Sequence, residues 1–175
     1  LLASVKPNQN KQAIKPAAQQ IIAVDRIDYS KGLLQRFSAY CSFLQQNPSY
    51  QNQLQLLQIA CPSRLDLPAY QRLYDKVKLA INDVNQQLSS HTCKTDGFET
   101  ATSKTDKALS NWQAITYSET VLSHETLMST FWQSDIGWVN SLKDGMNLLA
   151  KEYIAAQNPD NPGVLLLSRY AGAAE

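Results

Sequence analysis

The sequence of residues 21–44 is IIAVDRIDYSKGLLQRFSAYCSFL. Its first four residues are uniformly apolar, which predicts a strand that helices cover on both faces. Over residues 33–44 the apolar side chains recur at helical spacing, and the Asn47–Pro48 pair ends that helix. The loop between the two elements, residues 25–32, therefore leaves the carboxyl end of a buried strand, which is where parallel α/β sheets bind phosphorylated ligands.

The same alternation of strands and helices continues along the chain. Further strands are predicted over residues 54–60, 114–117, 136–139 and 164–167, and further helices over residues 68–88, 124–133 and 147–156. Residues 89–111 interrupt the pattern with a polar stretch rich in Thr, Ser and Lys, which we interpret as an insertion or long surface loop. Alternating β and α elements predict an α/β fold with a doubly wound parallel sheet.

Composition and charge narrow the class of protein. The 175 residues are 43% hydrophobic and 18% charged, as in an ordinary globular domain. A net charge of +1 offers no general attraction for nucleic acid or an anionic membrane. No apolar run reaches the roughly 18–20 residues of a membrane span, and Leu1–Val5 is too short for a signal-peptide core, so we expect a cytoplasmic protein.

Cys41, Cys61 and Cys93 lack the spacing of a zinc site or redox pair, and Cys41 is predicted to be a core residue.

The first loop supplies two cations, Arg26 and Lys31. An arginine can bind a phosphate with two hydrogen bonds, and a lysine adds a point charge. An equally supported interpretation from spacing alone is that Arg26 pairs with Asp25 or Asp28 while Lys31 is solvated in the first helical turn.

A second loop of the same kind spans residues 142–153. Gly145 precedes a predicted helix, so unpaired backbone N–H groups and the positive end of the helix dipole face one space. A carboxylate there repels phosphate, so we expect Asp144 to accept hydrogen bonds from sugar hydroxyls. Glu152 lies about one turn into the helix and can reach two vicinal hydroxyls; the alternative is an exposed helix residue beside Lys151.

Arg64 follows the second predicted strand, within Pro62–Arg64. It therefore reaches the same edge of the sheet as the two loops. The alternative is a helix-capping pair with Asp66.

Four segments in order, residues 25–32, 62–64, 144–153 and 168–174, resemble the trehalose-6-phosphate synthases, which are retaining glucosyltransferases of family 20. The related glucosylglycerol-phosphate synthases share much of the pattern. The resemblance runs from near Ile21 to the last residue. It implies that residues 1–175 are a truncated C-terminal, donor-binding domain of a two-domain GT-B enzyme, with the N-terminal acceptor domain and the closing helices absent.

The resemblance also implies residue roles. Arg26, Lys31 and Asp144 are the expected catalytic residues, and Arg64 is expected to hold the phosphate of the acceptor. The donor-binding set comprises Arg26, Lys31, Asp144, Gly145, Met146, Asn147, Leu148, Leu149 and Glu152. The implied reaction transfers glucose from a nucleoside diphosphate glucose, UDP-glucose above all, to glucose-6-phosphate by front-side attack. It uses no metal or other cofactor, and the usual catalytic histidine belongs to the absent domain.

One departure from the family pattern leaves the acceptor open. Residues 140–143 are Asn-Ser-Leu-Lys where the family commonly has Thr-Pro-Leu-Arg, so the acceptor preference of this loop is in question. The alternatives are a glucosylglycerol-phosphate synthase that uses ADP-glucose and glycerol-3-phosphate, an inactive nucleotide-sugar-binding module, and a flavodoxin-like phospho-ligand domain. The expected partners are the sugar nucleotide, a small phosphorylated acceptor and the absent N-terminal domain, and a homo-oligomer stays open.

Overall fold

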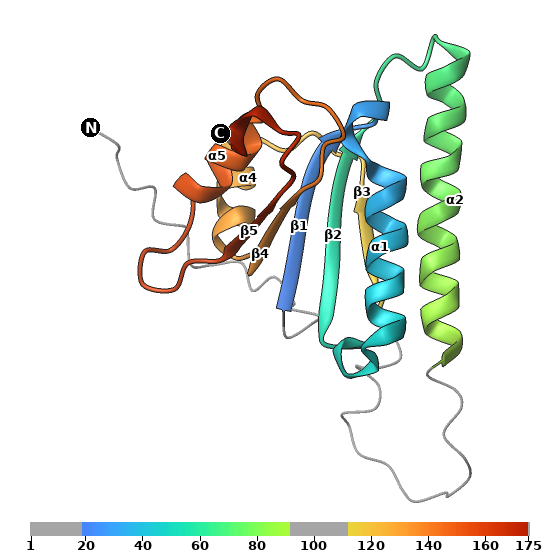
Figure 1. Ribbon diagram of the computed structural model, residues 1–175, viewed down its shortest axis with the longest axis horizontal. Coiled ribbons are helices and arrows are strands. Elements are labelled where there is room, and N and C mark those ends of the chain that lie inside the picture. Colours follow the sequence, from blue (N-terminus) through green and yellow to red (C-terminus); the bar gives the residue numbers. More distant parts are fainter. Residues whose placement is uncertain (1–18, 92–111, 175) are drawn as a thin grey trace, which may run out of the picture.

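The computed structural model describes residues 19–91 and 112–174, and these form one five-stranded parallel sheet with helices on both faces (Figure 1). The strands are β1 Gln19–Arg26, β2 Leu54–Cys61, β3 Ile115–Ser118, β4 Ile136–Val139 and β5 Val164–Leu167. Their order is β3-β2-β1-β4-β5, and every neighbouring pair is parallel. The predicted doubly wound α/β fold is therefore confirmed.

Four α-helices of the described residues cover the sheet. They are α1 Leu33–Gln46, α2 Pro68–His91, α4 His124–Trp132 and α5 Leu148–Ala155. Short 3-10 turns occur at Tyr29–Lys31, Pro48–Tyr50 and Gly172–Ala174. In Figure 1, α1 and α2 lie over β1, β2 and β3, whereas α4 and α5 lie on the opposite face near β4 and β5.

The middle of strand β1, residues 21–24, is apolar because it contributes to both cores. Ile21 and Ala23 pack with α1 and α2, whereas Ile22 packs with Phe131 of α4 and Tyr153 of α5. A strand covered on both faces cannot alternate polar and apolar residues. On the first face, the buried Cys41 is part of the core, as expected.

Several element boundaries differ from prediction by one or two residues, and the end of α2 differs by three. Helix α2 continues to His91, so residues 89–91 are helical and not part of the predicted loop. The Ser89 hydroxyl donates to the Asn85 carbonyl oxygen at 2.7 Å, which lets a polar residue continue the helix by bonding to its own preceding turn. Residues 92–111 of the predicted insertion lie outside the described residues.

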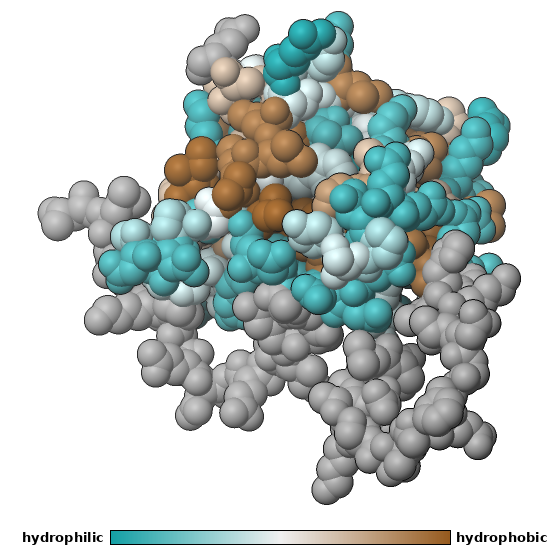
Figure 2. Space-filling view, turned by 60° about the horizontal axis from the view of Figure 1, so that its bottom comes forward, coloured by the Kyte–Doolittle hydropathy of each residue, from teal (hydrophilic) through white to brown (hydrophobic). Residues whose placement is uncertain are grey.

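The sheet is covered less completely at β5 than in the middle. Val164 and Leu166 of this edge strand are 66% and 52% exposed. The space-filling view shows apolar side chains gathered in one patch of the face that it presents (Figure 2). Among the described helices, none is long and apolar enough to cross a membrane.

The strand order reverses beside β1, and the crevice is defined as the region outside the carboxyl ends of β1 and β4. From β1 the chain passes through α1 to β2 on one side, whereas the other neighbour of β1 is β4, whose chain passes through α5 to β5. Because α1 and α5 lie on opposite faces, the chain leaves the adjacent strands β1 and β4 toward opposite faces of the sheet. Ligands of open α/β sheets bind at such a reversal of strand order.

Candidate functional site

The loop after β1 is shaped by an acid and a glycine. The Asp28 carboxylate accepts hydrogen bonds from the backbone N–H and the hydroxyl of Ser30, at 2.9 and 2.8 Å, and so caps the 3-10 turn. Gly32 has φ +66°, and a Cβ at this position would lie 2.8 Å from the Asn140 carbonyl oxygen. Only glycine combines this left-handed backbone with so close an approach of the neighbouring loop.

The loop after β4 is bound directly to the first loop. The Leu142 N–H donates to the Ser30 carbonyl oxygen at 2.7 Å. The Asn140 side-chain amide donates to the Gly32 carbonyl oxygen at 2.8 Å. Two segments more than 100 residues apart in sequence therefore form one wall of the crevice.

The segment after β5 holds Asp144 from the other side. The Asp144 N–H donates to the Tyr170 carbonyl oxygen at 3.1 Å, and the Gly172 N–H donates to the Asp144 carbonyl oxygen at 2.9 Å. A Cβ on Gly172 would collide with the Gly145 backbone. The backbone around Asp144 is thus fixed by segments that follow three strands.

Lys31 and Asp144 form an ion pair at the meeting point of the loops. The Lys31 ammonium lies 2.6 Å from Asp144 Oδ2, and both side chains are about one-seventh exposed, at 15% and 14%. The same oxygen accepts hydrogen bonds from Asn147 Nδ2 at 3.1 Å and from the Ser141 hydroxyl at 3.2 Å. Burial alone raises the pKa of Asp144, but the hydrogen bonds from Lys31 and Asn147 outweigh it and hold that pKa below its ordinary value of 3.8. The interpretation of Lys31 as a solvated residue was therefore wrong.

The Arg26 side chain is exposed at the end of β1. Asp25 pairs with Arg36 at 2.5 Å instead, and Asp28 accepts hydrogen bonds from Ser30 and Tyr70. Among the described residues, Arg26 makes no ion pair within 4.0 Å. Arg26 thus forms no close ion pair with Asp25 or Asp28. Burial alone raises the pKa of Asp28, but the Ser30 and Tyr70 hydrogen bonds, to which the charge of Arg26 adds, outweigh burial and lower that pKa. The exposed Arg26 guanidinium can bind an anion.

Arg64 contacts the first loop through a tyrosine. It has φ +51°, which is uncommon for a residue other than glycine and concentrates at functional sites. Arg64 Nη1 donates to the Tyr70 hydroxyl at 3.4 Å, and that hydroxyl donates to Asp28 Oδ2 at 3.2 Å. Within the described residues there is no ion pair between Arg64 and Asp66, so the predicted alternative was wrong.

Some of the remaining predicted donor-binding residues are exposed, and others are buried. A Cβ on Gly145 would meet open space, and Met146 and Leu148 are 61% and 58% exposed. Asn147 is buried, and its Oδ1 accepts a hydrogen bond from the Ala150 N–H as the N-cap of α5. Leu149 packs against the core around Ile22.

Glu152 is half-buried on α5. To the other described residues its carboxylate makes no hydrogen bond or ion pair, so it is available for a ligand.

Sequence patterns did not reveal a buried polar cluster beneath the loops. Arg36, on the apolar stripe of α1, is 1% exposed and contacts Asp25, Gln58 and Asn140. Burial raises the pKa of Asp25, and the adjacent Arg36 guanidinium acts against this shift. A charged residue at a stripe position, together with an acid at the end of an apolar strand, was the available signal for a buried ion pair.

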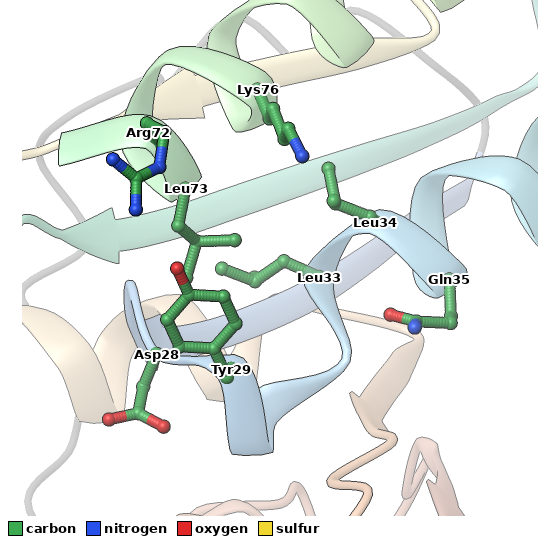
Figure 3. Close-up of a pocket in the computed structure, with 8 residues that line it drawn as sticks. All are labelled: Asp28, Tyr29, Leu33, Leu34, Gln35, Arg72, Leu73 and Lys76. Atoms are coloured by element: carbon green, nitrogen blue, oxygen red, sulfur yellow. The ribbon is translucent and has the colours of Figure 1, made fainter. Parts of the chain in front are cut away.

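A small pocket of about 150 Å³ lies beside the first loop (Figure 3). Asp28 and Tyr29 reach it from this loop, and Arg72 and Lys76 reach it from α2. Its remaining lining residues are Leu33, Leu34, Gln35 and Leu73. It contains none of the predicted donor-binding residues, so it is separate from the Lys31–Asp144 pair.

Comparison with known proteins identifies the family. Residues 3–97 and 104–175 match the model of glycosyltransferase family 20. The chain belongs to this family. It is 40% identical over 157 residues to a trehalose-6-phosphate synthase of Klebsiella pneumoniae, a match that covers 90% of this chain but 29% of the relative.

Two solved structures of glycosyltransferase family 20 relatives extend the likeness to three dimensions. One, from E. coli, is bound with UDP-2-fluoro glucose and has 38% identity and a TM-score of 0.76. The other is a UDP-forming trehalose-phosphate synthase from Burkholderia xenovorans in complex with glucose-6-phosphate, with 37% identity and a TM-score of 0.76. Each match covers 90% of this chain and 31% of the solved chain. The predicted family and fold are confirmed, and the flavodoxin-like alternative is wrong.

Proposed function

We propose that this chain supplies the sugar-nucleotide site of a trehalose-6-phosphate synthase, which transfers glucose from UDP-glucose to glucose-6-phosphate with retention at the anomeric carbon. The observation that carries the proposal is that exposed Arg26, at the carboxyl end of β1, and the Lys31–Asp144 ion pair, between the loops after β1 and β4, lie at the same edge of the sheet. The ligands of the related structures, UDP-2-fluoro glucose and glucose-6-phosphate, support the choice of donor and acceptor.

Arg26 and Lys31 are assigned to the donor diphosphate. As the anomeric bond breaks, negative charge grows on the leaving phosphate, and fixed cations stabilise that charge without reorganising. Because their charge interaction strengthens toward the transition state, both residues contribute more to turnover than to donor binding. The leaving phosphate itself helps to deprotonate the acceptor, so this scheme needs no carboxylate nucleophile and no metal.

Asp144 is assigned to the hydroxyls of the transferred glucose. Its Oδ2 holds Lys31 before the donor arrives, so a diphosphate that binds Lys31 loosens this ion pair. The carboxylate thereby becomes available as an acceptor for sugar hydroxyls at the same step. Donor binding and sugar recognition are coupled through one lysine.

The other assignments follow position along the two loops. Gly145, Met146 and Leu148 present open or exposed surface at the start of α5 and contact the donor, together with the Asn147 and Leu149 segment. Glu152 binds the ribose hydroxyls of the nucleotide. Arg64, which is exposed beside the first loop, binds the phosphate of the acceptor.

Within the complete enzyme, residues 1–175 are proposed to be the C-terminal, donor-binding domain. The chain spans 29–31% of the length of its relatives, so the acceptor domain and a catalytic histidine are expected in polypeptide outside it. The chain alone is therefore expected to bind UDP weakly and to transfer no glucose.

The test is a product assay on the full-length polypeptide that contains this chain. It is supplied with UDP-glucose plus glucose-6-phosphate and, in a parallel reaction, with ADP-glucose plus glycerol-3-phosphate. The proposal predicts trehalose-6-phosphate and UDP in the first reaction. Product in the second reaction alone would replace it with glucosylglycerol-phosphate synthesis, and sugar-nucleotide binding without either product would indicate an inactive binding module.

A further inference from the structure

The buried Arg36 side chain joins four elements at the carboxyl ends of the strands. Its Nη1 donates to Asp25 Oδ2 of β1 at 2.5 Å and to Gln58 Oε1 of β2 at 2.6 Å. Its Nε donates to Asn140 Oδ1, directly after β4, at 2.6 Å. Its guanidinium carbon also lies 5.9 Å from the centre of the Trp138 ring. Arg36 itself belongs to α1, so one side chain ties this helix to three neighbouring strands.

Asn140 extends this connection into the crevice. Its Oδ1 accepts from Arg36, and its Nδ2 donates to the Gly32 carbonyl oxygen at 2.8 Å. Gly32 directly follows Lys31, and Asn140 precedes Asp144 by four positions in the loop that also bonds to Ser30. The asparagine therefore lies between the backbone of the lysine-bearing loop and the backbone of the aspartate-bearing loop.

Stability alone does not account for this cluster. Removing a guanidinium from water is costly, and replacing a buried ion pair by apolar residues of similar volume is often neutral or stabilising. Here Arg36 is 1% exposed, and among the described residues its buried Nη2 has no hydrogen-bond partner. The cluster instead fixes the geometry of its neighbours. The planar Arg36 guanidinium donates hydrogen bonds at fixed angles, and Asn140 uses both the oxygen and the nitrogen of its side-chain amide.

We propose that Arg36 and Asn140 are positioning residues, which set the separation of the two loops so that Lys31 and Asp144 meet the donor correctly. Neither side chain touches the donor. The inference rests on the proposed sugar-nucleotide site and adds to it a device beneath that site. A displacement of about 1 Å at a reacting centre can cost two orders of magnitude in rate, so loss of this link is expected to reduce transfer strongly.

The variants separate positioning from stability. Asn140→Ala removes the link between Arg36 and Gly32, and Arg36→Lys retains a cation for Asp25 but lacks the Nε that bonds to Asn140. The matched control is Asn85→Ala, because the Asn85 amide also makes two hydrogen bonds, to the Ile115 N–H and carbonyl oxygen, both at 2.9 Å. Asn85 joins α2 to β3, away from both loops.

The measurements are the melting temperature, UDP affinity by calorimetry, and kcat and KM for UDP-glucose, all in the full-length polypeptide. We expect Asn140→Ala and Arg36→Lys each to lower kcat/KM for the donor about tenfold, and the double variant to lose little more than either, because both break one link. Asn85→Ala is expected to lower the melting temperature comparably while UDP affinity and kcat/KM stay within about twofold.

Each outcome decides the inference. If the donor kcat/KM of Asn140→Ala falls no further than that of Asn85→Ala, the cluster is only structural and the inference is wrong. Additive losses in the double variant would also overturn it. If Arg36→Lys does not fold, the comparison of Asn140→Ala with the control still decides. An unmodified protein that binds no UDP overturns the proposed function, and this inference with it.

Discussion

Neutralising Asp144 tests the coupling between the phosphate-binding cation and the sugar-binding acid. In the absence of ligand, Lys31 is held by Asp144 at 2.6 Å, so a diphosphate must compete with this carboxylate. Asp144→Asn keeps the shape of the side chain but removes its charge. We therefore expect the variant to bind UDP more tightly than the unmodified protein, even though its transfer activity falls.

The magnitude follows from the burial of the pair. Exposed ion pairs contribute about 0.2–1 kcal/mol, and hydrogen bonds to charged groups about 1.5–3 kcal/mol. With side chains 15% and 14% exposed, Lys31 and Asp144 lie between these cases. An asparagine oxygen still accepts one hydrogen bond from Lys31, so the substitution removes only part of the interaction. The binding free energy of UDP is therefore expected to become more favourable by about 1 kcal/mol. This corresponds to a fall of about fivefold in the dissociation constant of UDP.

Calorimetry with UDP and with UDP-glucose measures the effect. UDP-glucose is expected to gain less than UDP from Asp144→Asn, because the sugar hydroxyls lose a charged acceptor. Asp160→Asn is the matched control, since it removes the same charge from an exposed turn that precedes β5, at the opposite end of this strand from the crevice. Weaker UDP binding in Asp144→Asn, or equal gains for both ligands, would refute the reasoning.

Three further predictions concern the same loops. Lys31→Ala in the full-length polypeptide should lower kcat at least about tenfold, with a smaller change in donor affinity. An unchanged kcat in steady-state kinetics would contradict the assignment of Lys31 to the donor diphosphate. Gly32→Ala should destabilise by about 1–3 kcal/mol in urea unfolding, because alanine must adopt φ +66° and its Cβ approaches the Asn140 carbonyl oxygen at 2.8 Å. The lowered pKa of Asp144 contributes stability above its ordinary value of 3.8, which is lost as the pH falls through the folded-state value. Unfolding curves of Asp144→Asn and the unmodified protein should therefore converge as the pH falls below 3.8, and a constant difference would contradict this.

The fold was predictable because buried strands and amphipathic helices leave strong periodic signals. Strands β4 and β5 have the predicted bounds, 136–139 and 164–167, since apolar runs between turn residues have few other interpretations. The end of α2 was missed because Ser89 satisfies its hydroxyl within the helix, which polarity alone does not reveal.

The site was predictable in its parts but not in its connections. The loop positions of Arg26, Lys31 and Asp144 follow from local pattern, whereas the ion pair between the last two joins residues 113 positions apart. That contact depends on β4 lying beside β1, which no local pattern specifies. The buried partners of Arg36 were missed for the same reason.

A crystal structure of the full-length polypeptide with UDP-glucose tests the central claim most directly. The account predicts the diphosphate at the carboxyl ends of β1 and β4, within hydrogen-bond distance of Arg26 and Lys31, with Lys31 withdrawn from Asp144 and the glucose hydroxyls on the Asp144 carboxylate. A diphosphate bound elsewhere, with the Lys31–Asp144 pair intact at its present 2.6 Å, would contradict it.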